Sequence, residues 1–288
     1  MSCLQSRKTA FCIVTLIYLA ATALGVVVYI ALDQAFWLKL LVADVAATAF
    51  TFAFSVILKN ASVYDPYWSV QPIVIVLGFA IGYGVDLAGA FLLAAICFWG
   101  VRLTANWAYT FHGLHCQDWR YTMLKEKTGK FYPVINFVGI HLVPTLVVYG
   151  CVLPAAYVLY AGGAFNAGVA VFTALSVGAA VMQGVADIQM QKFRKAKTGG
   201  FIRIGLWKYS RHPNYLGEIL MWWGIGLASV CALGGAWWLL VGAVANTLLF
   251  LAVSIPMAEK RNARRGDFAA YKSETRMLLP VYKRAPKK

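Results

Sequence analysis

The sequence feature that most restricts the fold is a series of long apolar runs separated by short polar breaks. The first run, residues 10–32, is long enough to cross the hydrocarbon core of a bilayer as a helix, which takes ~20 residues. Hydrophobic residues make up 61% of the 288 residues and charged residues 13%, whereas soluble domains hold about 45–50% and about 25%. These observations predict an all-α, polytopic helix bundle integral to a membrane, with seven or eight transmembrane helices.

Eight apolar segments are the candidates for these helices. In chain order they cover residues 10–32, 36–58, 72–83, 87–109, 134–160, 165–185, 213–233 and 236–255. The segment 72–83 is the shortest, and it crosses the bilayer only if it takes in residues 68–69 or 84–85. Arg7 and Lys8 precede the first segment as in a signal peptide, but the apolar run exceeds the roughly 7–15 residues of such peptides. We therefore expect the first segment to remain as a membrane helix.

The net charge of +15 is concentrated in residues 120–130, 192–211 and 260–288. With eight spans these segments all fall on one side of the membrane, and the positive-inside rule makes that side cytoplasmic. We predict that both termini are cytoplasmic, in a bacterial inner membrane or the endoplasmic reticulum. The charges flank apolar spans and belong to no nucleic-acid-binding module, so membrane lipids are expected partners and nucleic acid is not.

Other common classes of site are disfavoured. The six cysteines are scattered without a Cys-x-x-Cys pair, and they suggest no disulfide framework. His112, His115 and Cys116 lie close together, but no second pair of zinc-site spacing accompanies them, so we predict no metal site. Transport is also disfavoured, because the sequence shows no internal repeat and its polar residues gather at one membrane face.

The richest set of polar groups lies in residues 205–218, where a basic loop enters an apolar run. Pro213 lacks an N–H and pre-sets φ, which suits the first turn of a helix. A helix start offers backbone N–H groups to an anion such as phosphate. Asn214 and Glu218, four residues apart, share one helix face. The same composition also fits a membrane-entry cap with snorkelling basic side chains, so the spacing alone leaves both interpretations open.

Ionisable residues within other spans indicate an interior site, because a charge in a membrane helix faces protein or water rather than lipid. Asp44 lies within the second span. Arg102 and Asn106 are four residues apart near the end of the fourth span, and Asp187 and Gln191 are four apart after the sixth. We expect Arg102 and Asn106 to contribute to a cofactor site.

Several motifs follow one another in an order that resembles a known family. They are Asp65-Pro-Tyr-Trp68, Asp118-Trp-Arg-Tyr121, Ala186-Asp-Ile-Gln-Met-Gln-Lys-Phe-Arg194, and residues 205–218 followed by Trp222-Trp-Gly224. Together they resemble the steroid 5-alpha-reductase-like family, and more closely its DUF1295 branch, from about Tyr64 to Pro280. The resemblance implies N-terminal transmembrane helices over residues 1–60 and a membrane catalytic domain over residues 61–288.

The resemblance also implies an activity: NADPH-dependent reduction of a C=C bond, conjugated to a carbonyl group, in a lipid or steroid-like substrate. Steroid reductases place a glutamate and a tyrosine in the N-terminal half to hydrogen-bond the substrate ketone, where this chain has Asp65, Tyr67, Trp68 and Trp99. We expect Tyr67, Trp68 and Glu218 to be catalytic. The positions that match nucleotide contacts are Asp187, Arg194, Asn214 and Glu218, with Arg211, His212, Tyr215 and Tyr271 as their neighbours.

Physical chemistry supports the same assignment. The planar fork of arginine binds phosphate bidentately, so Arg194, Arg203 and Arg211 are expected to surround the 2′-phosphate that distinguishes NADPH from NADH. Hydride addition to the β-carbon of an enone leaves negative charge on the carbonyl oxygen, which a tyrosine O–H would stabilise.

The alternative is a membrane methyltransferase that uses S-adenosylmethionine. Isoprenylcysteine carboxyl methyltransferases and phospholipid methyltransferases share the Arg-His-Pro-x-Tyr part of the motif on a related fold. Their C-terminal region tends to carry paired glutamates, whereas this chain has the single Glu259 there. Together with the match at Asp187–Arg194 and at Asn214 and Glu218, this difference favours the reductase.

Overall fold

The computed structural model describes residues 6–197 and 199–280, and in these ranges it is a helix bundle without an extended strand. Eight helical segments are long and apolar enough to cross a membrane. They are Arg7–Ala31, Phe36–Ile57, Ala61–Tyr83, Leu87–Thr110, Trp119–Ala161, Ala167–Ala196, Pro213–Ala232 and Trp237–Asn262. The predicted all-α, polytopic membrane bundle is therefore confirmed, with the higher of the two predicted numbers of spans.

The helices follow the predicted segments closely. They are α1 (Arg7–Ala31), α2 (Phe36–Ile57), α3 (Tyr67–Tyr83), α4 (Leu87–Thr110), α5 (Trp119–Thr128), α6 (Tyr132–Val134), α7 (Val143–Ala161), α8 (Ala167–Ala196), α9 (Pro213–Ala232), α10 (Val241–Leu249), α11 (Ile255–Asn262) and α12 (Phe268–Glu274). A π-helical stretch, Ile135–Leu142, continues α6 into α7, and a second, Phe250–Ser254, continues α10 into α11. Short 3-10 turns at Ala61–Tyr64, Gly205–Lys208 and Trp237–Leu240 precede α3, α9 and α10.

The predicted helix ends have local causes. α9 begins at Pro213 as expected. α8 ends at Ala196, after which Lys197, Gly199 and Gly200 all have positive φ, a conformation that stops a helix. The short third span gains length from the 3-10 turn before it, which extends the crossing segment to 23 residues.

Small residues allow α8 and α9 to pack along one another, the most extensive helix pairing in the bundle. Gly217 and Gly224 lie seven residues apart on one face of α9 and meet α8 directly. A Cβ at Gly217 would lie 2.8 Å from the carbonyl oxygen of Ala179, and one at Gly224 would collide with Ser176 Oγ. The backbones therefore approach as in other membrane helix pairs with small interfacial residues.

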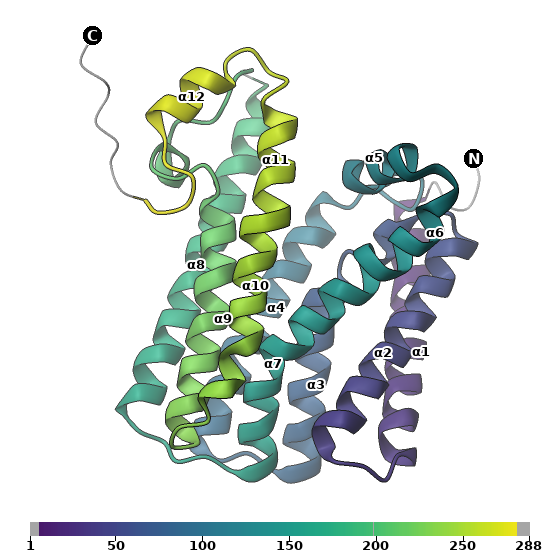
Figure 1. Cartoon of the computed structure of the whole chain (residues 1–288), viewed down its shortest axis with the longest axis vertical. Coiled ribbons are helices and arrows are strands. Elements are labelled where there is room, and N and C mark those ends of the chain that lie inside the picture. Colours follow the sequence, from purple (N-terminus) through teal and green to yellow (C-terminus); the bar gives the residue numbers. More distant parts are fainter. Residues whose placement is uncertain (1–5, 198, 281–288) are drawn as a thin grey trace.

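The bundle has two sides that are joined by its central helices. α8, α9, α10 and α11 form one side, whereas α1, α2, α5 and α6 form the other (Figure 1). α3, α4 and α7 lie between them, with α4 packed on α8 and α3 packed on both α4 and α7. The largest buried cluster contains Trp99, Trp222 and Ile225 and draws on these central helices.

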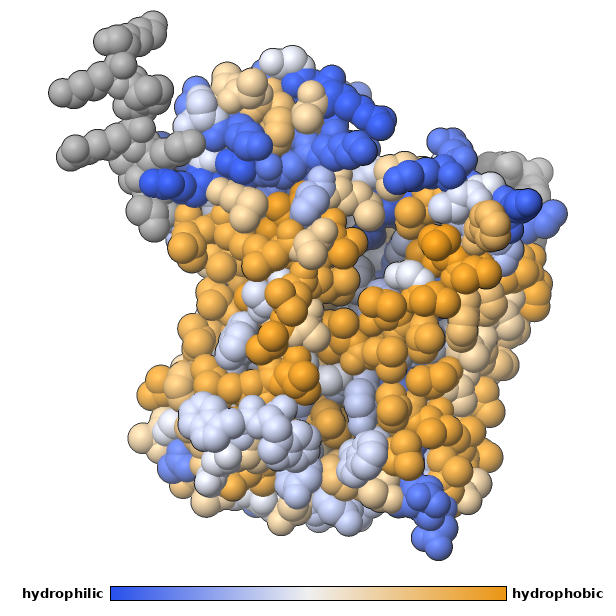
Figure 2. Space-filling model, viewed as in Figure 1, coloured by the Kyte–Doolittle hydropathy of each residue, from blue (hydrophilic) through white to orange (hydrophobic). Residues whose placement is uncertain are grey.

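Hydrophilic residues gather at the end of the bundle that carries α5, the end of α11 and α12, and an apolar belt covers the middle (Figure 2). The start of α1 and the end of α4 lie at the same end, because Arg7 Nη2 donates to the carbonyl oxygen of Ala108 at 2.7 Å. The described parts of the basic segments, residues 120–130, 192–197, 199–211 and 260–280, thus share one end, as the charge pattern predicted. That this end is cytoplasmic stays a prediction.

Candidate functional site

Glu218 lies at the centre of a polar seam between α4, α8 and α9. The residue is 9% exposed, and its carboxylate accepts three hydrogen bonds. Oε2 accepts from Trp99 Nε1 at 2.9 Å and from Gln183 Nε2 at 2.8 Å, and Oε1 accepts from Trp222 Nε1 at 2.9 Å. A carboxylate surrounded by N–H donors is satisfied inside an apolar bundle, where an unpaired one would be very costly.

The seam continues from Glu218 toward the polar end of the bundle. Gln183 Oε1 accepts from Arg102 Nη2 at 2.6 Å, and Arg102 Nη1 forms an ion pair with Asp187 Oδ2 at 2.9 Å. Asn214 Nδ2 lies 3.5 Å from the other oxygen of Asp187. Arg102 Nε is buried and has no hydrogen-bond partner within the described ranges. The seam therefore offers one unused guanidinium N–H.

One turn closer to the polar end, Gln191 Nε2 of α8 donates a 2.5 Å hydrogen bond to Asn106 Oδ1 of α4. Arg194, one turn further along α8, is exposed. The structure thus brings together most of the predicted nucleotide residues, namely Arg102, Asn106, Asp187, Asn214 and Glu218, with Arg194 at the end of the same helix.

A second cluster fixes the loop before α9 to the C-terminal segment. Arg211 Nε forms a 2.6 Å ion pair with Glu259 Oε1 on α11, and its side chain also donates to the carbonyl oxygen of Thr275. Its backbone N–H donates to the carbonyl oxygen of Arg276 at 2.8 Å. Arg211 is only 8% exposed, so its guanidinium is largely occupied by the protein itself.

His212 belongs to the same cluster. Its Nε2 lies 3.4 Å from Glu259 Oε1, and its ring stacks on Tyr215 with centroids 5.2 Å apart. Burial lowers the pKa of His212 from 6.5 to about 4, although Glu259 acts in the opposite direction. The imidazole is therefore neutral at pH 7.

Tyr271 closes the C-terminal segment over the loop that follows α8. Its hydroxyl donates to the carbonyl oxygen of Trp207 at 2.9 Å, and its ring stacks on Phe201. Burial raises the pKa of Tyr271 to about 12. Arg203 lies over the same ring and forms an exposed 3.1 Å ion pair with Glu274. The structure thus places Arg203, Arg211 and Tyr271 in contacts that hold this segment.

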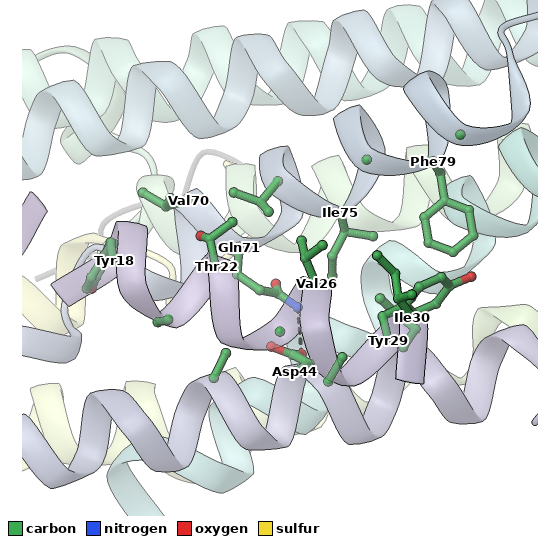
Figure 3. A pocket seen from close by; sticks show the side chains of 18 of the residues that line it. Tyr18, Thr22, Val26, Tyr29, Ile30, Asp44, Val70, Gln71, Ile75 and Phe79 are labelled. Atoms are coloured by element: carbon green, nitrogen blue, oxygen red, sulfur yellow. Dashed lines mark hydrogen bonds between the residues drawn. The ribbon is translucent and has the colours of Figure 1, made fainter. Parts of the chain in front are cut away.

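A cavity of about 430 Å³ lies between α1, α2 and α3 (Figure 3), and α3 in turn packs on α4, which carries Trp99 and Arg102 of the seam. Its lining is mostly apolar, with Val26, Ile30, Ile75 and Phe79 among the residues that face it. Gly78 of α3 also lines it, and a Cβ there would meet nothing within 4 Å. The space suits an apolar ligand, and its lining residues belong to spans that cross the membrane.

The polar part of this cavity is Asp44 with two partners from α3. Tyr67 donates to Asp44 Oδ1 at 2.9 Å, and Gln71 Nε2 donates to Asp44 Oδ2 at 2.6 Å. Asp44 is 5% exposed, which confirms that this charge within a span faces protein. Gln71 Oε1 has no partner within the described ranges.

The two residues predicted to act together in the N-terminal half face different surroundings. Tyr67 lines the cavity, whereas Trp68 packs against the buried cluster that contains Trp99 and Trp222. Asp65 faces neither, since it accepts a 2.6 Å hydrogen bond from Tyr121. Adjacent residues of α3 thus contact the cavity and the core around Glu218.

Three residues of the seam and the cavity were not among the predicted site residues: Gln183, Asp44 and Gln71. The signal for Gln183 was present, because it lies four residues before Asp187 and eight before Gln191, on one helix face. Asp44 was visible as a charge in a span, but its partners lie more than twenty residues further along the chain. Gln71 carried no distinguishing pattern.

Comparison with known proteins agrees with the motifs. The profile of a family described as a protein of unknown function, DUF1295, matches residues 51–275. An uncharacterized protein of Schizosaccharomyces pombe is 27% identical over 197 residues, which cover 58% of this chain and 57% of the relative. The match thus spans little more than half of that relative. No solved structure matches this chain.

The family match includes every residue of the seam around Glu218. Of the cluster in the cavity it includes Tyr67 and Gln71, whereas Asp44 lies before its first residue. All four motifs of the sequence lie within it. The chain is therefore a multi-pass membrane protein that belongs to the DUF1295 family.

Proposed function

We propose that this protein is an oxidoreductase that reduces a C=C bond, conjugated to a carbonyl group, in a lipid or steroid-like substrate with NADPH. The observation that carries the proposal is the pair Tyr67 and Asp44, which places a phenol and a carboxyl group in an otherwise apolar cavity among membrane helices. The resemblance to the steroid 5-alpha-reductase-like family supports the same assignment.

The cavity supplies binding for the substrate. Its apolar lining suits a hydrocarbon skeleton that is taken from the bilayer. Tyr67 and Gln71 are donors, and one of them can turn from Asp44 to the substrate carbonyl oxygen. When a hydride adds to the β-carbon, the negative charge moves to that oxygen, where a preorganised O–H or N–H donor stabilises it. A proton then adds to the α-carbon and completes the reduction.

The seam between α4, α8 and α9 supplies residues that suit a dinucleotide. Arg102 has an unused, buried N–H, and Asn214 and Asp187 are side-chain groups that hydrogen-bond hydroxyl and amide groups. Arg194 is exposed beside Lys192 and Lys195, so these cations suit phosphate groups. NADPH, when bound, would supply the hydride.

Two predicted residues receive narrower roles under this proposal. Glu218 fixes Gln183, and Gln183 in turn accepts from Arg102. Glu218 would therefore position Arg102, in addition to its expected catalytic role. Arg211 is occupied by Glu259 and backbone carbonyl groups, so we assign it to the C-terminal segment and Arg194 to the 2′-phosphate.

Equilibrium binding to the purified, detergent-solubilised protein tests this function. NADPH should bind, with NADH weaker and S-adenosylmethionine without effect. Arg194→Ala should weaken NADPH about ten- to a hundredfold, as expected for a charge-assisted contact, and leave NADH unchanged. Arg264→Ala, which removes an exposed charge from the same end of the bundle, is the matched control.

Turnover completes the test. NADPH oxidation should depend on an added enone, with a 3-oxo-4-ene steroid and a long-chain conjugated enone as probes. Binding of S-adenosylmethionine without binding of NADPH would instead support the methyltransferase and overturn the proposal.

A further inference from the structure

A second, smaller cavity lies at the polar end of the bundle, away from both parts of the proposed reductase site. It measures about 170 Å³ and lies between the end of α2, α5 with the residue Gln117 before it, and the stretch from α6 into α7. A water molecule takes about 30 Å³ in the liquid, so the space holds a group of several heavy atoms. Its polar lining consists of Ser55, Lys59, Asn60, Gln117, Lys125, Tyr132 and Asn136.

The buried part of this cavity contains polar atoms without partners. Asn136 is only 4% exposed and donates to Ser55 Oγ at 3.1 Å, but its Oδ1 has no hydrogen bond within the described ranges. The hydroxyl of Tyr132 is buried and is likewise unpaired there. Buried polar groups are nearly always satisfied, so an unpaired acceptor and an unpaired hydroxyl in one cavity indicate a ligand that donates hydrogen bonds.

The outer part of the cavity is cationic. Lys59 and Lys125 are exposed, and none of the lining residues is acidic. Lys59, the residue after the C-cap Leu58 of α2, has a φ of 53°, and the N–H of Asn60 donates to the carbonyl oxygen of Ser55. Glycine is the residue that usually occupies such a position. A lysine stands here despite the conformational cost, and it adds a positive charge to the lining of the cavity.

Cations outside and a hydrogen-bond acceptor inside define the ligand chemistry. The ligand carries an anionic oxygen group together with a hydroxyl or amine a few atoms away, as in a glycerol phosphate ester. The cavity adjoins the C-terminal end of α2, a helix long and apolar enough to cross a membrane, and the ends of such a helix come close to the lipid head groups. We propose that this cavity binds the phosphate-bearing head group of a membrane phospholipid, with phosphatidylglycerol as the test case.

Thermal melts of the purified protein with added lipid test the site. Dioctanoyl phosphatidylglycerol should raise the melting temperature of the wild type in a saturable manner, and sn-glycerol 3-phosphate or inorganic phosphate at the same concentration should raise it less. Lys125→Ala should weaken the apparent affinity about tenfold or more, as expected for loss of one charge-assisted contact inside the cavity. Asn136→Leu should also weaken it, because it removes the acceptor Oδ1 that the donor of the head group would use.

Two comparisons separate this site from general surface charge. Lys127→Ala removes the same charge two residues away on α5, outside the cavity lining, and it should leave the lipid response unchanged. Lys59→Gly should melt no lower than the wild type without lipid, because glycine adopts positive φ without strain, yet it should respond less to lipid.

Some results would overturn the inference. An equal loss of response in Lys127→Ala would assign the effect to surface charge alone. Lower melting of Lys59→Gly and Lys125→Ala with an unchanged lipid response would show that these lysines only complement the helix ends. A response to glycerol 3-phosphate equal to that for the lipid would contradict a lipid ligand.

Discussion

The indole nitrogen of Trp99 on α4 donates a 2.9 Å hydrogen bond to Glu218 Oε2 on α9, across the interior of the bundle. The ring of Trp99 also meets that of Trp222 edge to face, with centroids 4.8 Å apart. Because Trp222 and Gln183 donate to the same carboxylate, one side chain sets the relative positions of three membrane helices.

Replacement of Glu218 should lower the stability of the protein, and more so for leucine than for glutamine. Both carboxylate oxygens accept, so Glu218→Gln turns an NH₂ group toward an N–H donor and leaves that donor unpaired, at a cost of about 1–3 kcal/mol. Glu218→Leu leaves three donors unpaired and should melt lower still, with weaker NADPH binding in both variants. Melts in detergent measure this, with Glu126→Gln on the exposed face of α5 as the control. Wild-type melting and binding in both variants would contradict the role of Glu218.

The ion pair between Arg102 and Asp187 should show strong coupling in a double-mutant cycle. Its side chains are only 16% and 14% exposed, so loss of one partner leaves a poorly solvated charge. We expect Arg102→Met and Asp187→Asn to couple by about 1–3 kcal/mol in unfolding free energy. The pair of Arg120 and Asp118 is more exposed, at 34% and 26%, and should couple by less than about 1 kcal/mol. Equal coupling in the two cycles would show that burial does not strengthen the interior pair.

Tyr67→Phe should impair turnover without a matching loss of structure. The substitution keeps the ring in the cavity and removes only the hydroxyl that donates to Asp44. Loss of a donor that stabilises developing charge typically lowers kcat by about 10²–10³. Steady-state oxidation of NADPH with an enone probe measures this. Tyr18 lines the same cavity, but its hydroxyl donates to the carbonyl oxygen of Val63, so Tyr18→Phe should retain kcat. Equal rates in the two variants would remove Tyr67 from the reaction.

Gly78→Leu should block the larger cavity. A Cβ at Gly78 meets no atom within 4 Å, so the added side chain enters the cavity without a clash with the backbone. We expect a folded protein whose KM for the enone rises about tenfold or more, since burial of the substrate is lost. Gly178 on α8 is also open around its Cβ and does not line the cavity, which makes Gly178→Leu the matched control. An unchanged KM in Gly78→Leu would place the substrate elsewhere.

The buried His212 should make stability depend on pH below neutrality. Burial lowers the pKa of His212 to about 4 in the folded protein, whereas an unfolded histidine titrates near 6.5. As pH falls, the unfolded chain therefore takes up the proton before the folded protein does. The contribution of neutral His212 to the free energy of unfolding is thus complete above about pH 6.5 and is lost as pH falls toward 4. The loss should amount to about 3 kcal/mol. In His212→Asn the melting temperature should depend less on pH between about 4 and 6.5. An unchanged dependence would show that other titratable groups cause it.

Much of the architecture is determined by local sequence. The apolar runs fix eight membrane helices, because in a bilayer each backbone N–H and C=O must be satisfied within its own segment. The start of α9 at Pro213 and the end of α8 before Gly199 follow from the chemistry of single residues. The polar stripe of α4 was visible from the spacing of Arg102 and Asn106, and that of α8 from the spacing of Asp187 and Gln191, because helix periodicity is local.

The pairing of these stripes was decided only by the tertiary structure. Nothing near Glu218 in the sequence selects Trp99 as its partner, which lies 119 positions earlier. The same holds for Arg211, which guanidinium chemistry assigned to phosphate and which packing directs to Glu259 on α11. Asp44 meets Tyr67 and Gln71 because α2 and α3 face one cavity. Periodicity tells which side of a helix is polar, whereas the choice of partner depends on how distant helices rotate and pack against each other.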